Sequence, residues 1–330
     1  MKITTKDIAR LAGVSRGTVD RALNNRPGIT SITKEKVLKV ARELSYRPNM
    51  VARSLVKGQT MSIGVVVFDL YNRFFAQLLN TLELKARDLG YFTYVTLTEK
   101  DPDVEYECLS NLADRNVDGI ILFSVNKGKA YDEFLKSLQI PIVTVGNFVS
   151  KNWIFIGAND SQCMKDAVQN VLNCGYNQLI YVSPPLVNRD KVNMHTLEQR
   201  LKGFIKGCEE SNIKDLDYII IQQQDYKDEL DHFCHQNSFK TAIMCSSDIY
   251  ALEILIHLES KGIRVPDDVG LMGFDNIDIL KYVKPSLTTV SYPIENIAIQ
   301  AVNTLVKCIK GEKVPMSSIL DYTINMRDSI

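Results

Sequence analysis

The sequence predicts an N-terminal all-α helix-turn-helix head and a hinge helix, followed by a larger two-lobed α/β body with doubly wound parallel sheets. Three observations indicate this: closely spaced helix signals in residues 1–57, a reversal of net charge near residue 60, and strands alternating with helices in the remainder. We expect the head to cover residues 1–48, the hinge and linker residues 49–60, and the body residues 61–330.

The first helix of the head has a clear start signal at Thr4. Asp7, three residues further on, completes a capping-box-like start and places a carboxylate near the positive end of the helix. Ile8, Leu11 and Ala12 recur at helical spacing, so we expect them to line one face of this helix.

A second helix is expected over residues 16–23, because Gly13 can supply the turn and Ser15 can cap the helix start. Its expected inward positions are Val19, Ala22 and Leu23, and its outward positions are Arg16, Gly17, Thr18 and Arg21. A helix in this position enters the DNA major groove in helix-turn-helix proteins. A plain three-helix bundle would share the pattern, but the charge distribution favours DNA binding.

The charge of the chain is divided between its two parts. Residues 1–60 contain 13 lysines and arginines against 4 aspartates and glutamates, a net charge of +9. The whole chain has 39 of each kind, so the remainder has a net charge of −9. This asymmetry predicts a head that faces nucleic acid. Its candidate phosphate contacts are Arg10, Arg16, Arg21, Arg26, Lys34, Arg47, Arg53 and Lys57.

The body alternates short apolar, β-branched runs with amphipathic stretches. We expect strands at residues 62–68, 91–97, 119–123, 141–145, 179–182, 218–222, 241–245 and 269–274. We expect helices that include residues 75–89, 104–115, 163–173, 197–211 and 249–261. Strands spaced by helices indicate parallel sheets covered on both faces. Because there are too many strands for one compact sheet, two lobes are predicted.

Several classes of protein are disfavoured by what the sequence lacks. No apolar run follows a basic start, and no stretch has the length of a membrane span, so neither a signal peptide nor a membrane segment is expected. The seven scattered cysteines indicate reduced thiols in the cytoplasm. His232, Cys234 and His235 lie close together, but we interpret them as a polar surface helix, and expect no metal and no cofactor. Neither a GxGxxG nor a P-loop nor a GxSxG motif is present, which disfavours an enzyme.

Motifs along the whole chain resemble the lactose/galactose repressor (LacI/GalR) family. In the head and hinge they are Asp7-Ile8-Ala9-Arg10-Leu11-Ala12-Gly13-Val14-Ser15, Thr18-Val19, Leu23-Asn24, Leu44-Ser45-Tyr46-Arg47-Pro48-Asn49 and Ala52-Arg53-Ser54-Leu55. In the body they are Val265-Pro266-Asp267-Asp268-Val269, Gly273-Phe274-Asp275-Asn276 and Leu287-Thr288-Thr289-Val290. One departure is Asp20, where the family usually has serine. Its carboxylate would repel phosphate unless it pairs with Arg16 or Arg21, or accepts a hydrogen bond from a cytosine amino group.

The resemblance implies a cytoplasmic, sequence-specific transcriptional regulator that binds double-stranded operator DNA as a homodimer, and we expect a repressor. Leu55 from each hinge helix would wedge into the minor groove. The implied DNA contacts are Thr4, Ser15, Arg16, Gly17, Thr18, Arg21, Asn24, Tyr46, Asn49, Ala52, Arg53 and Leu55. The body would be periplasmic-binding-protein-like, with lobe 1 at about 61–160 and 291–320 and lobe 2 at about 161–290 and 321–330.

The resemblance also implies a small-molecule effector, bound between the lobes at the carboxyl ends of the strands. The implied effector contacts are Asp69, Asn72, Phe74, Ser124, Arg200, Tyr226, Ser247, Asp248 and Asp275. A carboxylate and an arginine facing hydroxyl groups favour a sugar or sugar derivative, while a purine, a nucleoside or a phosphosugar stays open. A solute-binding protein for transport would share the two-lobed body, but the basic head and the absence of a signal peptide disfavour it.

Overall fold

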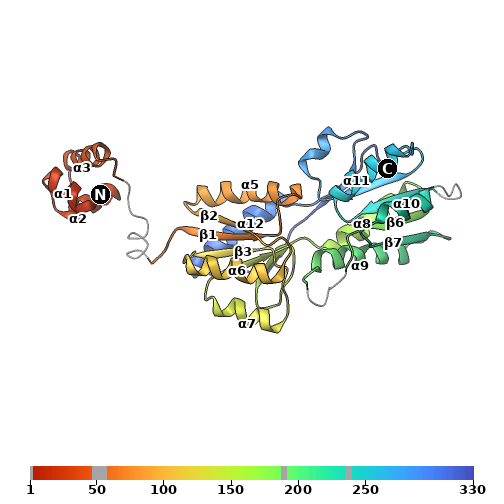
Figure 1. Cartoon of the computed structure of the whole chain (residues 1–330), viewed down its shortest axis with the longest axis horizontal. Coiled ribbons are helices and arrows are strands. Elements are labelled where there is room, and N and C mark those ends of the chain that lie inside the picture. Colours follow the sequence, from red (N-terminus) through yellow and green to blue (C-terminus); the bar gives the residue numbers. More distant parts are fainter. Residues whose placement is uncertain (1–2, 47–57, 187–191, 235–239) are drawn as a thin grey trace. The chain divides into compact units, whose positions relative to one another are not determined.

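The computed structural model describes residues 3–46, 58–186, 192–234 and 240–330. The chain divides into two compact units, the head (Met1–Thr60) and the body (Met61–Ile330), which differ in colour in Figure 1.

The described residues of the head form α1 (Thr5–Ala12), α2 (Arg16–Leu23) and α3 (Ser31–Glu43). Between α1 and α2, Gly13 has a φ of 64°, a left-handed conformation that favours glycine and closes a tight turn. Ser15 caps α2 because its side chain accepts a hydrogen bond from the Thr18 amide at 3.1 Å. The expected helix-turn-helix is confirmed.

One expected core position of the head is wrong. Leu11 is 55% exposed, and Ala9 occupies the inward position instead. Ile8, Ala9 and Ala12 form the buried stripe of α1. Because each residue turns a helix by about 100°, Leu11 lies to one side of that stripe.

Lobe 1 of the body is built on a six-stranded parallel sheet in the order β11-β5-β4-β3-β1-β2. Its strands are β1 (Ser62–Val67), β2 (Phe92–Leu97), β3 (Gly119–Leu122), β4 (Ile142–Val145), β5 (Ile154–Gly157) and β11 (Ser317–Ile319). Its helices are α5 (Arg73–Asp88), α6 (Pro102–Asp114), α7 (Lys129–Ser137) and α12 (Ile294–Ile309). Alternate strand residues point to opposite faces, so Val65 packs with α5 and α12 while Val66 packs with α6 and α7.

Lobe 2 is built on a second six-stranded sheet, in the order β12-β10-β9-β8-β6-β7, in which only the β10–β12 pair is antiparallel. Its strands are β6 (Gln178–Val182), β7 (Asp217–Ile221), β8 (Thr241–Cys245), β9 (Gly270–Phe274), β10 (Thr288–Ser291) and β12 (Thr323–Asn325). Its α-helices are α8 (Asp160–Asn173), α9 (His195–Glu209), α10 (Tyr226–Cys234) and α11 (Asp248–Ser260), and a 3-10 helix, η1, spans Asp278–Tyr282. Helices α8 and α9 pack on one face, and α10 and α11 on the other.

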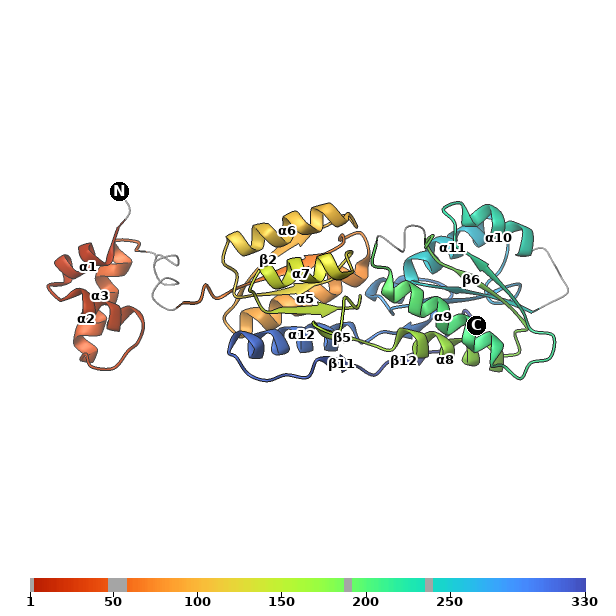
Figure 2. The same cartoon turned by 90° about the horizontal axis from the view of Figure 1, so that it is seen from below.

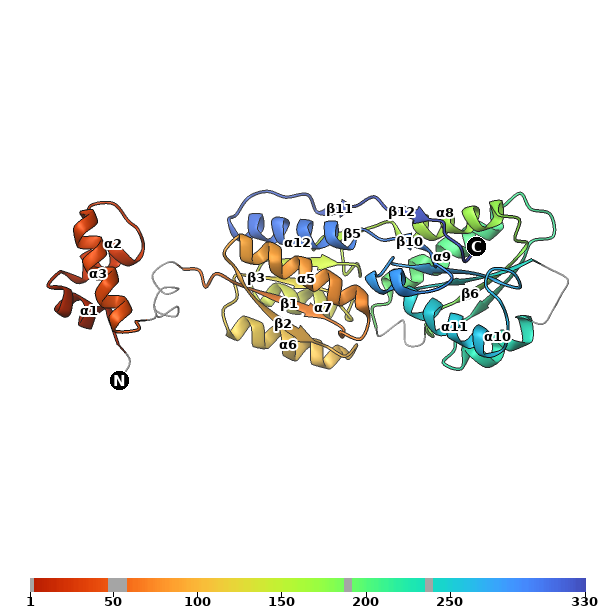
Figure 3. The same cartoon turned by 90° about the horizontal axis from the view of Figure 1, so that it is seen from above.

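The chain passes between the lobes three times: from β5 to α8, from β10 to α12, and from β11 to β12. Figures 2 and 3 show the late, blue segments in both lobes. All eight expected strands are present, and the doubly wound fold class is confirmed. Strands β5, β10, β11 and β12 were not expected; β11 and β12 have three residues each, too few to show a periodicity. Of the helices in the described ranges, none combines the length and apolarity needed to cross a membrane.

The contact between α8 and α9 allows a test of this packing. A Cβ atom at Gly203 would lie 2.1 Å from the Ser161 carbonyl oxygen, which belongs to the backbone and has little freedom to move. We expect Gly203→Ala to lower the free energy of unfolding by about 1–3 kcal/mol through overpacking. Urea unfolding measures this, and Lys202→Ala, at an exposed position of the same helix, is the control. Equal stability of the two variants would contradict the close packing.

Candidate functional site

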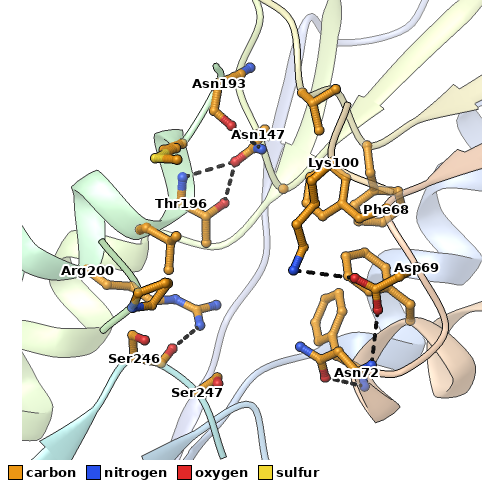
Figure 4. Close-up of a pocket in the computed structure, with 18 of the residues that line it drawn as sticks. Phe68, Asp69, Asn72, Lys100, Asn147, Asn193, Thr196, Arg200, Ser246 and Ser247 are labelled. Atoms are coloured by element: carbon orange, nitrogen blue, oxygen red, sulfur yellow. Dashed lines mark hydrogen bonds and ion pairs between the residues drawn. The ribbon is translucent and has the colours of Figure 1, made fainter. Parts of the chain in front are cut away.

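A cavity of about 430 Å³ lies between the two lobes, within the size range of small-molecule sites. Ten of its lining residues lie one or two positions after the carboxyl end of a parallel strand, where open α/β sheets bind ligands. From lobe 1 these strand-end residues are Phe68, Asp69, Phe123, Gly146 and Asn147, and from lobe 2 they are Pro184, Ser246, Ser247, Asp275 and Tyr292. Figure 4 labels five of them, Phe68, Asp69, Asn147, Ser246 and Ser247, around the space between the lobes.

Aromatic side chains form much of the apolar lining. Phe74 and Phe75 begin α5 and meet edge-to-face, with ring centroids 5.2 Å apart. The Phe74 ring also approaches Tyr292, at the end of β10, with centroids 5.9 Å apart. Phe68, Phe123 and Tyr250 complete the aromatic lining. Such rings can stack on the apolar face of a ligand.

Arg200 is the central charged residue of the cavity. Its Nε donates a hydrogen bond to Asp160 Oδ1 at 2.9 Å, and one terminal nitrogen donates to the Ser246 carbonyl oxygen at 2.6 Å. The same terminal nitrogen lies 3.3 Å from Asp275 Oδ1. The guanidinium stacks on the Phe274 ring, 3.7 Å from its centroid. Burial alone would lower the pKa of Arg200, but the carboxylates of Asp275 and Asp160 hold this pKa above its ordinary value.

Asp275 is held in a strained conformation at the edge of this cluster. Its φ is 114°, which side chains rarely adopt, and such strain is typical of functional sites. Burial raises the pKa of its carboxyl group, against the opposing effect of Arg200. Its Oδ1 is ion-paired with Arg200 but accepts no hydrogen bond from the described residues, and Ser246 Oγ has no hydrogen-bond partner among them. Because buried polar atoms in proteins are nearly always satisfied, both oxygens are available to hydrogen-bond a ligand in the cavity.

The lobe 1 wall is organised by hydrogen bonds within one loop. Asp69 Oδ1 accepts from the amides of Tyr71 and Asn72, and Asn72 Oδ1 caps α5 by accepting from the Phe74 amide at 3.0 Å. The Lys100 ammonium lies 3.4 Å from Asp69 Oδ2. Each of these polar groups therefore has a partner inside the protein.

Polar contacts also join the lobes on two sides of the cavity. On one side, Asn147 Oδ1 of lobe 1 accepts from the amide and hydroxyl of Thr196 in lobe 2, at 3.1 and 3.0 Å (Figure 4). On the other, Arg73 of α5 forms an ion pair with Asp278 of η1, whose amide donates to Gln77. These bonds hold the lobes together around the cavity.

Six of the nine expected effector contacts line the cavity: Asp69, Asn72, Phe74, Arg200, Ser247 and Asp275. The other three do not line it. Ser124 is buried behind the cavity, where its hydroxyl donates to Glu105. Tyr226 packs in the lobe 2 core and donates to Glu253, so it is no aromatic wall. Asp248 faces β10 and accepts hydrogen bonds from the Thr289 hydroxyl and the Ile277 amide.

The sequence analysis missed several cavity residues, among them Lys100, Asn147, Asn193, Thr196, Tyr250 and Tyr292. Asn147 follows an expected strand, and that position alone could have identified it. Thr196 lies in the first turn of α9, and Tyr292 follows a strand of four residues, so neither has a comparable sequence signal.

The outward face of α2 is exposed, as expected, at Arg16, Gly17 and Arg21, while Thr18 is half-buried. Thr4 caps α1 and Ser15 caps α2, and both residues are exposed. Asn24 ends α2, and Tyr46 packs against the head core. The remaining expected DNA contacts, Asn49, Ala52, Arg53 and Leu55, lie outside the described residues.

Asp20 has partners that the sequence analysis did not consider. Its carboxylate accepts a hydrogen bond from Asn24 at 2.8 Å and forms an ion pair with Arg26 at 3.0 Å. Its partners are therefore neither Arg16 nor Arg21. This pairing reduces the repulsion between Asp20 and phosphate. It also means that Arg26, one of the expected phosphate contacts, forms an ion pair within the head.

Comparison with known proteins agrees with both units. Residues 4–49 match the family described as "Bacterial regulatory proteins, lacI family", and residues 168–330 match the "Periplasmic binding protein-like domain". The chain is 32% identical to catabolite control protein A of Priestia megaterium over 336 residues, covering 100% of this chain and 99% of the relative.

Two solved structures share the fold. A periplasmic binding protein/LacI transcriptional regulator of Alkaliphilus metalliredigens, complexed with D-xylulofuranose, is 26% identical, with a TM-score of 0.71 over 82% of this chain and 98% of that one. The Lac repressor dimer bound to operator and the anti-inducer ONPF is 22% identical, with a TM-score of 0.84 over 100% and 99%. The helix-turn-helix head, the two-lobed body and the full-length relative lead to one conclusion: this chain belongs to the lacI family of bacterial regulatory proteins and is a DNA-binding transcriptional regulator.

Proposed function

We propose that the protein is a repressor that binds operator DNA as a homodimer, and that a neutral sugar or polyol in the cavity changes its operator affinity. The assignment of the ligand class depends on one observation, the pairing of opposite charges around the cavity. Lys100 faces Asp69 at 3.4 Å, and Arg200 lies between Asp160 and Asp275. Among the described residues that line the cavity, these are the two cationic side chains, and both already have carboxylate partners.

A phosphate group would need a cation without such a partner, so the pairing disfavours a phosphosugar. Hydroxyl groups need donors and acceptors instead. Asp275 Oδ1 and Ser246 Oγ offer these, and the phenylalanine rings cover an apolar face. D-xylulofuranose, bound by the relative from Alkaliphilus metalliredigens, is a ligand of this kind.

Operator reading would depend on the exposed face of α2. Arg16 and Arg21 project from this helix, and Gly17 between them gives the backbone room to approach the DNA. We assign base contact to Arg16, at the first turn of α2, and phosphate contact to Arg10, which is 77% exposed on α1. We further infer that the protein acts in the cytoplasm and has no catalytic activity.

The homodimer would form through the exposed edge of the lobe 1 sheet. Strand β2 is the last strand of that sheet, and its Phe92 and Val95 are 64% and 46% exposed. Leu84 of the adjoining α5 is 51% exposed. Exposed apolar side chains on an edge strand favour pairing with another chain, and a twofold axis lets the same patch meet its copy. The dimeric Lac repressor, similar over the whole chain, is consistent with this.

The first test of this function concerns base reading. We expect Arg16→Ala to change the preferred base at one operator position, at about 1–3 kcal/mol if the guanidinium grips a guanine. Arg10→Ala should weaken all sites about equally, which makes it the matched control. Selection of binding sites from a random DNA pool measures both. If Arg16→Ala selected the same sequence as the parent, the assignment of α2 as reader would be wrong.

The proposed dimer interface at the β2 edge of the lobe 1 sheet can be tested by introducing a charged side chain there. We expect Phe92→Glu to weaken dimerisation about a hundredfold, because an unpaired carboxylate buried in an interface costs about 3 kcal/mol or more. Ile319→Glu is the control, since Ile319 is 54% exposed on β11 at the opposite edge of the same sheet. Sedimentation equilibrium measures the dissociation constant. Equal effects of both substitutions would place the interface elsewhere.

The ligand assignment is tested by thermal-shift screening of the full-length protein against neutral sugars, polyols, nucleosides and phosphosugars. We expect a neutral sugar or polyol to give the largest shift. Asp275→Asn should then weaken its binding at least about tenfold, because the substitution removes a charged acceptor. Tyr226→Phe should bind normally, since Tyr226 lies outside the lining. A phosphosugar as the best ligand, or unchanged binding by Asp275→Asn, would contradict the proposal.

A further inference from the structure

A buried carboxylate lies behind the cavity without touching it. Glu105, in the first turn of α6, has 0% exposure. Its Oε1 accepts from the Ser124 hydroxyl at 2.8 Å and from the amide and side chain of Asn126 at 3.2 and 3.1 Å. Its Oε2 accepts from the Val125 amide at 2.7 Å. The carboxylate thus binds three consecutive residues, 124–126, which form the loop after β3.

The other side of the same loop faces lobe 2. The Ser124 carbonyl accepts from the Asn147 side chain at 3.0 Å. The Val125 carbonyl accepts from the Asn193 amide at 2.7 Å, and the Asn126 carbonyl accepts from the Asn193 side chain at 3.2 Å. Each residue of the loop therefore bonds Glu105 on one side and a bridging asparagine on the other.

Hydrogen bonds from both bridging asparagines reach the start of α9, and Figure 4 shows those of Asn147. Asn147 Oδ1 binds the amide and hydroxyl of Thr196, and Asn193 Oδ1 accepts from the His195 amide at 3.2 Å. Arg200 lies one turn after Thr196 on this helix, and its guanidinium lines the cavity. A continuous series of hydrogen bonds thus leads from Glu105 in lobe 1 to the cavity residues of lobe 2.

We propose that Glu105 is a positioning residue for the cavity: it holds the 124–126 loop in the arrangement whose Val125 and Asn126 carbonyls bind Asn193 of lobe 2. In the same arrangement the Ser124 carbonyl binds Asn147, the lobe 1 residue that contacts Thr196. Only a carboxylate accepts hydrogen bonds on both oxygens and donates none, which is what four converging donors require. Burial raises the pKa of the Glu105 carboxyl group although the surrounding donors oppose this. The inference goes beyond the proposed function, since it needs no knowledge of the ligand.

Hydrogen exchange of the full-length protein, followed by mass spectrometry, tests this assignment without a ligand. In Glu105→Gln the side-chain amide replaces one acceptor oxygen with a donor, so the loop loses bonds that hold it. We expect exchange in peptides containing Val125 and Asn126 to become about tenfold faster, and exchange in peptides containing Asn193 and Thr196 to accelerate as well. The control, Glu107→Gln, changes an exposed glutamate on the same helix and should leave both regions unchanged.

The lobe 2 peptides decide the outcome, because Glu105 touches none of their residues. Acceleration confined to α6 and the loop would show that Glu105 has only a local structural role, and would overturn the proposal. If Glu105→Gln does not fold, Ser124→Ala removes one of the four donors and is expected to give the same pattern with a smaller amplitude. Unchanged exchange of the lobe 2 segment in a folded Ser124→Ala variant, alongside faster exchange of the loop, would likewise overturn it.

Discussion

The buried guanidinium of Arg200 is the interaction on which the rest of the cavity depends. It binds Asp160, which begins α8 where the chain first crosses between the lobes, and it pairs with Asp275 at the end of β9. Tyr292, at the second crossing, donates to Asp160 from the other side. One side chain therefore connects the crossing segments to the cavity wall. Its removal would leave the buried carboxylates of Asp160 and Asp275 without their positively charged partner, a change far more costly than the loss of a surface charge.

Arg200 also limits what the cavity can bind. Because two carboxylates already neutralise its charge, it offers geometry and hydrogen bonds rather than net attraction for an anion. Asp275 completes the arrangement with an unsatisfied oxygen, held by a backbone conformation that few residues tolerate. A ligand that satisfies this oxygen would interact with lobe 2, and contacts with Asn72 and Phe74 would engage lobe 1. Such a ligand can shift the lobes only by its difference in affinity between two arrangements.

The same principle of local pairing recurs at Glu105 and Asp20. Glu105 is buried among four donors from one loop, and its effect on the cavity is transmitted through the carbonyls of that loop. Asp20 lies on α2 of a basic head, yet its ion pair with Arg26 and hydrogen bond with Asn24 remain within the head. In each case the partners of a charged side chain decide its role.

The sequence by itself determined the fold class, the family and most of the regular elements. Helix caps, the glycine turn and eight of the strands depend on local backbone preferences and on periodicity, which a sequence displays directly. The family resemblance also indicated six cavity residues, of which Asp69, Ser247 and Asp275 follow strand ends that meet at one edge of a parallel sheet. Tertiary structure alone decided the direction of individual side chains. Ser124 and Asp248 turn away from the cavity to satisfy buried partners, and Asn147 meets Thr196 although 49 residues separate them. Hydrogen bonds between distant segments depend on how the lobes pack, and no local pattern records that packing.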